Sequence, residues 1–223
     1  MSHKSFHLSL FSIVLALLLC AGGRAQSGGS GVVLVNLLPV TEEMDLALNG
    51  QSMGKMRAGA ASGPLPLGPG ENTITLSWGE DSKAEGKVTA KPGVTSIVVA
   101  YPDRSAAGTA VQGGEGKKAF AFSELPSGVR VAQPQFAMFS GLAAPTVLGI
   151  DGQEITFNPY VAKKVGGNSG RIKVTGGKQT LLDLDANPPA CLDGPMRWYL
   201  FAVGDTETDS VKIVPVPDFK YEW

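Results

Sequence analysis

The sequence is poor in the side chains on which most catalytic and metal-binding sites depend. Its 223 residues include only two His and two Cys. Three of these four residues, His3, His7 and Cys20, lie in the N-terminal apolar segment, so a chain cleaved after Ala25 keeps only Cys191. A single thiol cannot form an intrachain disulfide, and we expect it to be buried.

The same shortage removes the common catalytic arrangements. A Ser or Cys nucleophile most often needs a His base, and zinc sites need several His or Cys ligands. We therefore predict that the protein is not an enzyme, that it has no catalytic, cofactor-binding or metal-binding residues, and that it uses no cofactor.

A strong net charge is also missing. The chain carries 19 Lys and Arg against 20 Asp and Glu, and without residues 1–25, which hold Lys4 and Arg24, the balance is 17 − 20 = −3. Such a chain has no field that attracts nucleic acid or an anionic membrane. We expect no nucleic-acid partner, and no transmembrane segment in the mature chain.

Residues 1–25 have the pattern of a signal peptide. Lys4 supplies the positive charge, Leu8 to Leu19 is an apolar stretch too short for a membrane span, and small residues before Gln26 predict cleavage there. The alternative is a lipoprotein acylated on Cys20, although a Leu precedes this Cys where a small residue is usual. The expected location is the periplasm or the extracellular space.

What the sequence does contain is a turn motif that occurs twice, about 100 residues apart. Leu48-Asn49-Gly50-Gln51 is the first copy and Ile150-Asp151-Gly152-Gln153 the second. Asn-Gly or Asp-Gly between apolar runs predicts a type I′ hairpin turn, in which both central residues have φ > 0. The repetition indicates two related all-β domains.

The residues before the first turn predict two strands. Gly31 to Leu38 is nearly continuous apolar sequence, which is typical of a central strand. Met44, Leu46 and Leu48 alternate with other residues and predict a strand that enters the turn. A short helix beginning at Thr41 is the alternative.

Further short strands follow, separated by turn residues. In the first half, Gly63 to Gly70 is expected to be a rigid turn segment from which Leu65 and Leu67 point into the core. In the second half, Gly177 to Leu181 repeats the pattern of Gly70 to Ile74, and Trp198 to Val203 repeats that of Ile97 to Tyr101. Short strands at this spacing indicate sandwiches or barrels.

We therefore predict an all-β fold with two tandem antiparallel β-sandwich (immunoglobulin-like) domains. The expected bounds are 31–103 for the first domain, 104–118 for a Gly/Ala-rich linker and 119–218 for the second domain. Phe120 and Phe122 alternate, and they predict a short strand that docks on either domain.

The first half also carries a familiar order of segments, namely Val32 to Asn36, Pro39, Asp45 to Gly50, Pro66 to Gly70 and Val94 to Val99. They resemble an uncharacterised bacterial secreted β-sandwich domain family. Two such domains behind a signal peptide are also similar to the periplasmic accessory proteins of alginate O-acetylation. The second half departs from the pattern at Gln133-Pro134-Gln135 and has no counterpart of Asp45. The resemblance implies a fold and brings no catalytic residues with it.

Two acidic patches are candidate calcium sites. Asp183, Asp185 and Asn187 begin like a calcium loop, but Pro188 and Gly194 stand where Gly and a bidentate Glu are required. Asp205, Glu207 and Asp209 lie in the turn between the last two strands, where a solvated hairpin tip is the favoured interpretation.

Aromatic side chains offer another kind of site. A stacking platform for sugar rings could be built from Trp78, Tyr101, Tyr160, Trp198 and Tyr199. Aromatic residues on strands are more often core residues, and we favour that interpretation. Trp198 and Tyr199 are adjacent, so they must face opposite sides of a strand. One of them is then expected outside its sandwich or at the domain interface.

These observations lead to a functional hypothesis. We expect a non-enzymatic secreted or periplasmic protein that binds or scaffolds another cell-envelope component through exposed strand edges. The expected partner is an envelope protein or a polysaccharide. The alternative, which the resemblance implies, is an accessory protein of exopolysaccharide (alginate-like) O-acetylation or a glycan-binding module.

Overall fold

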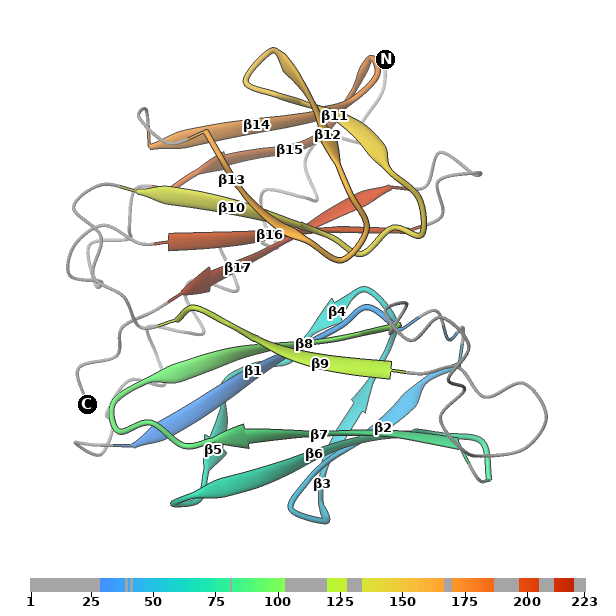
Figure 1. Ribbon diagram of the computed structural model, residues 1–223, viewed down its shortest axis with the longest axis vertical. Helices are drawn as coiled ribbons and strands as arrows, with labels where there is room; N and C mark the ends of the chain where they lie inside the picture. Colours follow the sequence, from blue (N-terminus) through green and yellow to red (C-terminus); the bar gives the residue numbers. More distant parts are fainter. Residues whose placement is uncertain are drawn as a thin grey trace, which may run out of the picture.

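A computed structural model describes residues 29–38, 40, 42–80, 82–102, 120–127, 134–166, 170–186, 197–204 and 211–218. Within these ranges the regular structure consists of strands, arranged in four sheets that are stacked as layers (Figure 1). No helix in the described ranges is long and apolar enough to cross a membrane. Residues 1–25, residues 104–118 and Cys191 lie outside these ranges.

The first sandwich holds the two sheets in the lower half of Figure 1. The sheet nearer the middle has the order β4-β1-β8-β9, with β5 also paired to β1: β1 (Ser30–Asn36), β4 (Ala60–Ala61), β5 (Leu65–Leu67), β8 (Thr95–Pro102) and β9 (Phe120–Leu125). The outer sheet has the order β3-β2-β6-β7: β2 (Met44–Leu48), β3 (Gln51–Met56), β6 (Glu71–Trp78) and β7 (Ser82–Thr89).

The second sandwich repeats this plan in the upper half of the figure. Its inner sheet has the order β13-β10-β16-β17: β10 (Gln135–Ser140), β13 (Ala162–Val165), β16 (Arg197–Val203) and β17 (Lys212–Asp218). Its outer sheet has the order β12-β11-β14-β15: β11 (Thr146–Ile150), β12 (Gln153–Phe157), β14 (Arg171–Gly176) and β15 (Gln179–Asp185). The matching strand orders confirm two tandem β-sandwiches of one design.

The strand pairing adds a feature that the sequence did not reveal. In each domain the first strand pairs in parallel with a strand near the domain's end, β1 with β8 and β10 with β16, while the other pairs are antiparallel. Parallel strands are usually buried on both faces, and their sequences are then nearly continuous runs of apolar residues. Six consecutive residues of β1, Gly31 to Asn36, are buried, as are the last five of β16.

Three expectations need correction. The strand of Phe120 and Phe122 pairs with β8 of the first sandwich, so the predicted start of the second domain at residue 119 is wrong. The helix alternative from Thr41 is wrong because Met44–Leu48 is a strand. Gly177 lies in the turn after β14, which corresponds to the turn after β6, so its match to Gly70 is also wrong.

Packing explains why β9 belongs to the first sandwich. Phe122 packs against the first core and covers Gly86 of β7, where an added Cβ would lie 2.2 Å from the Phe122 ring. Only glycine leaves room for the ring at this distance. This contact closes one side of the first sandwich, between the edges β7 and β9.

The two hairpin turns have the predicted geometry. Asn49 and Gly50 have φ values of 50° and 78°, and Asp151 and Gly152 have values of 49° and 85°. Each turn also binds the next strand in the same way. Asn49 Oδ1 accepts a hydrogen bond of 2.8 Å from the Thr73 amide, and Asp151 Oδ1 accepts one of 2.8 Å from the Lys173 amide. The turn therefore fixes the place of β6 or β14 as well as the hairpin register.

Buried side chains form three apolar clusters, one inside each sandwich and one between them. The cluster between the sandwiches joins the outward faces of β1 and β8 to those of β10 and β16. Its buried members are Val33, Val35, Leu37, Ile97, Val99 and Leu125 from the first domain and Phe139, Tyr199, Phe201, Val203 and Val216 from the second. The two domains thus share an apolar layer, which we call the interdomain core.

Close backbone approaches and hydrogen bonds accompany this layer. Gly141 lies against Leu37, so that an added Cβ would meet Leu37 Cδ1 at 2.9 Å and the Ala202 carbonyl oxygen at 3.0 Å. The Tyr199 hydroxyl donates to the Pro126 carbonyl, and Arg197 donates to the same oxygen at 3.2 Å. The chain is thus held to the second domain directly after it leaves β9.

A substitution at Gly141 tests how far the domains depend on each other. We expect Gly141→Leu to destabilise the protein by about 1–3 kcal/mol, because the side chain enters a filled interface. Gly63→Leu is the matched control, since no heavy atom lies within 4 Å of an added Cβ at Gly63. Thermal and urea unfolding give the measurement. If Gly141→Leu and the unmodified chain have equal unfolding midpoints, the close packing at Gly141 contributes nothing to stability.

Candidate functional site

The five candidate platform aromatics pack within or against the three apolar clusters. Trp78 packs against the first core and Trp198 against the second, whereas Tyr199 is 3% exposed in the interdomain core. Tyr101 stacks on Tyr160 across the domain interface, with ring centroids 5.4 Å apart. The core interpretation is confirmed for Tyr199, whereas the other four side chains are partly buried against the three clusters. Trp198 and Tyr199 face opposite sides of their strand, as expected.

The first acidic patch is an ion pair on a sheet surface. Asp183 lies on β15 and accepts two hydrogen bonds of 2.7 Å from the Nε and Nη2 atoms of Arg171 on β14. Among the described residues, no group of three or more His, Cys, Asp or Glu side chains is placed to hold a metal ion. Asn187, Asp205, Glu207 and Asp209 lie outside the described ranges.

This ion pair lowers the pKa of the Asp183 carboxyl. Hydrogen bonds from Arg171 hold the pKa of the Asp183 carboxyl below its ordinary value, and the charges of Arg171 and Lys173 act in the same direction. The Asp183 side chain is 39% exposed, so solvent screens much of the effect.

The pair therefore predicts a small pH-dependent term in stability. Because the folded-state pKa of Asp183 is depressed, the stabilisation is present above the unfolded-state pKa of about 4 and is lost as the pH falls through the folded-state pKa. We expect Arg171→Gln to lower the free energy of unfolding at neutral pH and to have no such effect in strong acid. Urea unfolding at both pH values checks this, with Lys163→Gln as the control. If the difference in free energy of unfolding between Arg171→Gln and the unmodified protein is the same at both pH values, the prediction is wrong.

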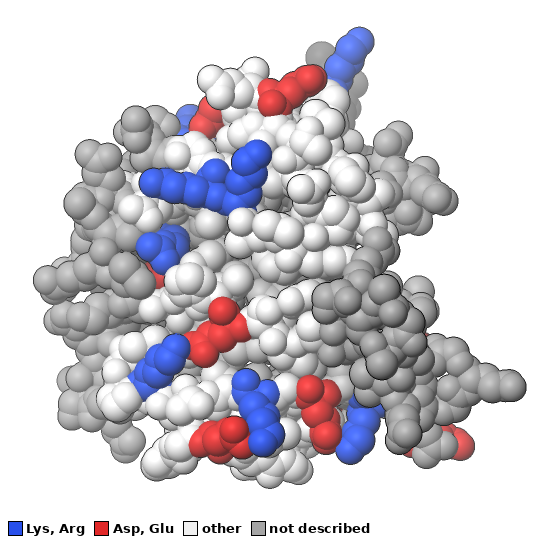
Figure 2. Space-filling model, in the orientation of Figure 1, with Lys and Arg blue, Asp and Glu red and all other residues white. Residues whose placement is uncertain are grey.

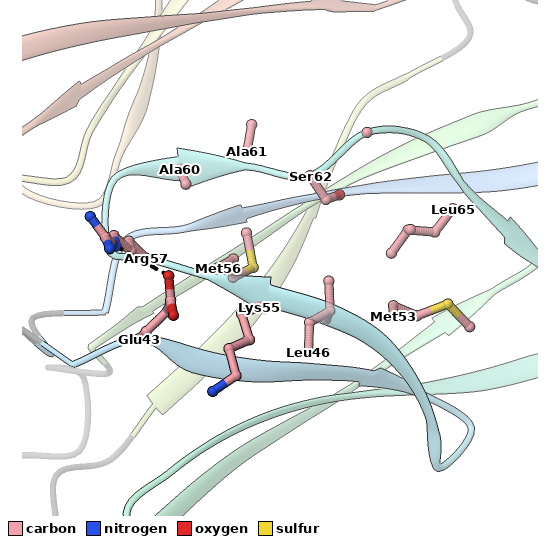
Figure 3. A pocket seen from close by; sticks show the side chains of 11 residues that line it. Glu43, Leu46, Met53, Lys55, Met56, Arg57, Ala60, Ala61, Ser62 and Leu65 are labelled. Carbon is pink, nitrogen blue, oxygen red and sulfur yellow. Dashed lines mark hydrogen bonds and ion pairs between the residues drawn. The ribbon is translucent and has the colours of Figure 1, made fainter. Parts of the chain in front are cut away.

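A pocket opens on one side of the first sandwich, between β3 of the outer sheet and β4 and β5 of the inner sheet (Figure 3). Its volume is about 410 Å³. The lining is apolar at the centre and charged at one end, and comprises Glu43, Leu46, Met53, Lys55, Met56, Arg57, Ala60, Ala61, Ser62, Gly63 and Leu65.

A β-bulge in β3 forms one wall of the pocket. Leu46 pairs with Gly54 and Ala47 with Ser52, so Met53 is an extra residue in the ladder. Gly54 has a φ of 109°, a value that side-chain-bearing residues rarely adopt. Bulges at sheet edges commonly re-aim a side chain, and here Met53 faces the space that Leu65 enters from the other sheet (Figure 3).

The opposite wall is a broken strand. β4 and β5 both pair with β1, but Gly63 and Pro64 separate them. Ser62 keeps the chain on β1 at the break, because its amide donates to the Leu34 carbonyl at 2.8 Å and its Oγ accepts from the Leu34 amide at 2.9 Å. Leu65 and Leu67 pack against the first core as predicted, but the expected turn is wrong for these residues because they form the strand β5.

The second sandwich shows what fills the corresponding place. There Leu148 pairs with Ile155, as Leu46 pairs with Gly54 in the first sandwich. Ile155 packs against the second core, and Phe157 is buried with 1% exposure. The edge strand β13 is unbroken and pairs with β10 over four residues. The bulge at Met53 and the break at Gly63-Pro64, which bound the pocket, are thus local departures of the first copy from the common design.

Two loose ion pairs lie at the charged end of the pocket. Arg57 Nε is 3.3 Å from Glu43 Oε1, and Lys55 Nζ is 3.7 Å from Asp45 Oδ1. Both cations are well exposed, at 77% and 58% of the side chain. The Lys91–Glu124 pair elsewhere in the domain is shorter, at 2.6 Å. Exposed pairs of this kind contribute little to stability, so their partners can be exchanged readily.

Elsewhere on the visible face, charges of both signs are interspersed (Figure 2). Lys and Arg side chains lie among Asp and Glu side chains, particularly over the first sandwich. This distribution agrees with the near-zero net charge of the chain and gives this face no single-sign field.

The sequence carries one weak signal of the pocket. It is the stretch from Gln51 to Met56, where Met53-Gly54 interrupts the expected alternation after the turn. Comparison of the chain with protein-family models and with curated proteins gave no match. The function must therefore be argued from the geometry of the pocket.

Proposed function

We propose that this is a non-enzymatic binding protein of the cell envelope or the extracellular space, and that the pocket of the first sandwich is its recognition site. The observation that carries the proposal is the contrast between the two copies. At positions where the second sandwich places Ile155 and Phe157, the first has Gly54 and Met56 and an open pocket. Removing core volume costs stability, so a retained pocket suggests a use.

The interdomain core supports a scaffolding role for the second sandwich. It packs against the sheet that provides β4, and Gly59, in the turn between β3 and β4, lies against Val203 of β16. An added Cβ at Gly59 would be 3.1 Å from Val203 Cγ2. The second domain thereby supports the wall of the pocket. Secretion is part of the proposal and rests on the pattern of residues 1–25.

The alternative, a glycan-binding module or an accessory protein of polysaccharide O-acetylation, has less support. It rests on the resemblance of the sequence. Of the five aromatic side chains considered for stacking on sugar rings, Tyr199 is buried and the other four are partly buried against the apolar clusters. The second candidate function is therefore that of an accessory protein that acts through another protein.

Affinity capture from envelope extracts of the producing cells tests the proposal. We expect the immobilised protein to retain a component that Ala60→Phe loses, because the aromatic ring fills the pocket. Ala162→Phe is the matched control, since Ala162 occupies the corresponding edge strand, β13, of the second sandwich and is exposed. If all three proteins retain the same material, the pocket is not the recognition site.

A further inference from the structure

We infer that the pocket binds the apolar chain of a single-chain amphiphile with an anionic head, of which a fatty-acid anion is the simplest case. The inference deepens the proposed function and depends on it. It follows from the lining of the pocket, the nature of the two strand edges beside it and the charges at its end.

The centre of the pocket suits a flexible apolar chain. Leu46, Met53, Met56 and Leu65 project into it from both sheets (Figure 3). Methionine side chains are unbranched and polarisable, so they adapt to ligands without a fixed shape. The volume of about 410 Å³ is within the usual range for small-molecule sites.

The strand edges argue against an extended peptide as the occupant. Strand addition needs a regular row of free backbone N–H and C=O groups. β3 interrupts this row with the bulge at Met53 and carries Lys55, and both features protect edges from pairing. On the opposite edge Pro64 and Pro66 have no N–H group to donate. An acyl chain requires no backbone pairing.

The polar groups of the pocket argue against a sugar. No aromatic residue lines it, the hydroxyl of Ser62 already accepts a hydrogen bond from the Leu34 amide, and the charged lining residues Glu43, Lys55 and Arg57 lie at one end and not around the apolar centre. A sugar needs several convergent hydrogen-bonding groups or a stacking face.

The guanidinium of Arg57, at the charged end of the pocket, is the group that can bind the head group. Lys55 and Arg57 each pair with a carboxylate, that of Asp45 and that of Glu43, so these four charges balance. Glu43 engages Arg57 through Nε, and a guanidinium has further N–H donors in a geometry that matches carboxylates. A carboxylate at this end can therefore bind Arg57 while the chain extends towards Met53.

The test is to titrate the chain without residues 1–25 with hexadecanoate, at concentrations below the critical micelle concentration of hexadecanoate. Calorimetry and native mass spectrometry give the affinity and the number of molecules bound. We expect one molecule per chain, and affinity that rises roughly fourfold per methylene along a series from octanoate. Ala60→Phe should weaken binding roughly tenfold or more, and Arg57→Gln roughly fivefold, while Ala162→Phe should bind like the unmodified protein. Met53→Glu, at the bulge, is a second blocking variant should Ala60→Phe fail to fold.

Three results would overturn the inference. The first is the absence of saturable hexadecanoate binding, the second is equal binding of hexadecyltrimethylammonium, and the third is adsorption to phosphatidylglycerol vesicles that both blocking variants retain. If hexadecanoate fails to bind while Ala60→Phe still abolishes capture of an envelope component, the ligand class is wrong and the proposed function stands.

Discussion

The structure depends on the burial of two parallel strand pairs on both of their faces. β1 and β8 in the first domain, and β10 and β16 in the second, each face their own sandwich on one side and the other domain on the other side. A sheet buried on one face needs only alternating apolar residues, whereas these strands need apolar residues at nearly every position. The interdomain core satisfies this demand, because each inner sheet covers the exposed face of its counterpart.

This arrangement explains the strict features of the domain boundary. Gly141 must be small because Leu37 of the other domain lies against it. The Pro126 carbonyl, at the end of β9, is bound by Tyr199 and Arg197 of the second domain. A pair of domains joined only by a flexible linker would need none of these contacts. The two sandwiches are therefore better regarded as halves of one four-layer body.

The two sandwiches differ at their edges, away from the interdomain core. The first sandwich is closed on one side by Phe122 over Gly86 and open on the other at the pocket. In the second sandwich Ile155 and Phe157 pack where the first has the bulge and Met56. Since the shared layer lies elsewhere, an opening at this edge costs local packing energy and leaves the domain arrangement intact. This separation of stability from recognition supports a binding function for the first copy.

The sequence by itself determined the local structure: the type I′ turns at Asn49-Gly50 and Asp151-Gly152, the alternating strand that leads into the first turn, and the two-domain all-β design. These features are local because they depend on the φ preferences of a few residues and on side chains two positions apart. The sequence also indicated that Gly31 to Leu38 is buried, but it could not show what covers it. The tertiary structure alone decided that β1 and β8 pair in parallel, that β9 joins the first sandwich and that Tyr199 faces the other domain. It also created the pocket, because the bulge at Met53 and the break at Gly63-Pro64 bound a common space only when the two sheets stack. Periodicity in the sequence shows which face of a strand is buried, but the partner that buries it is set by packing between residues far apart in the chain.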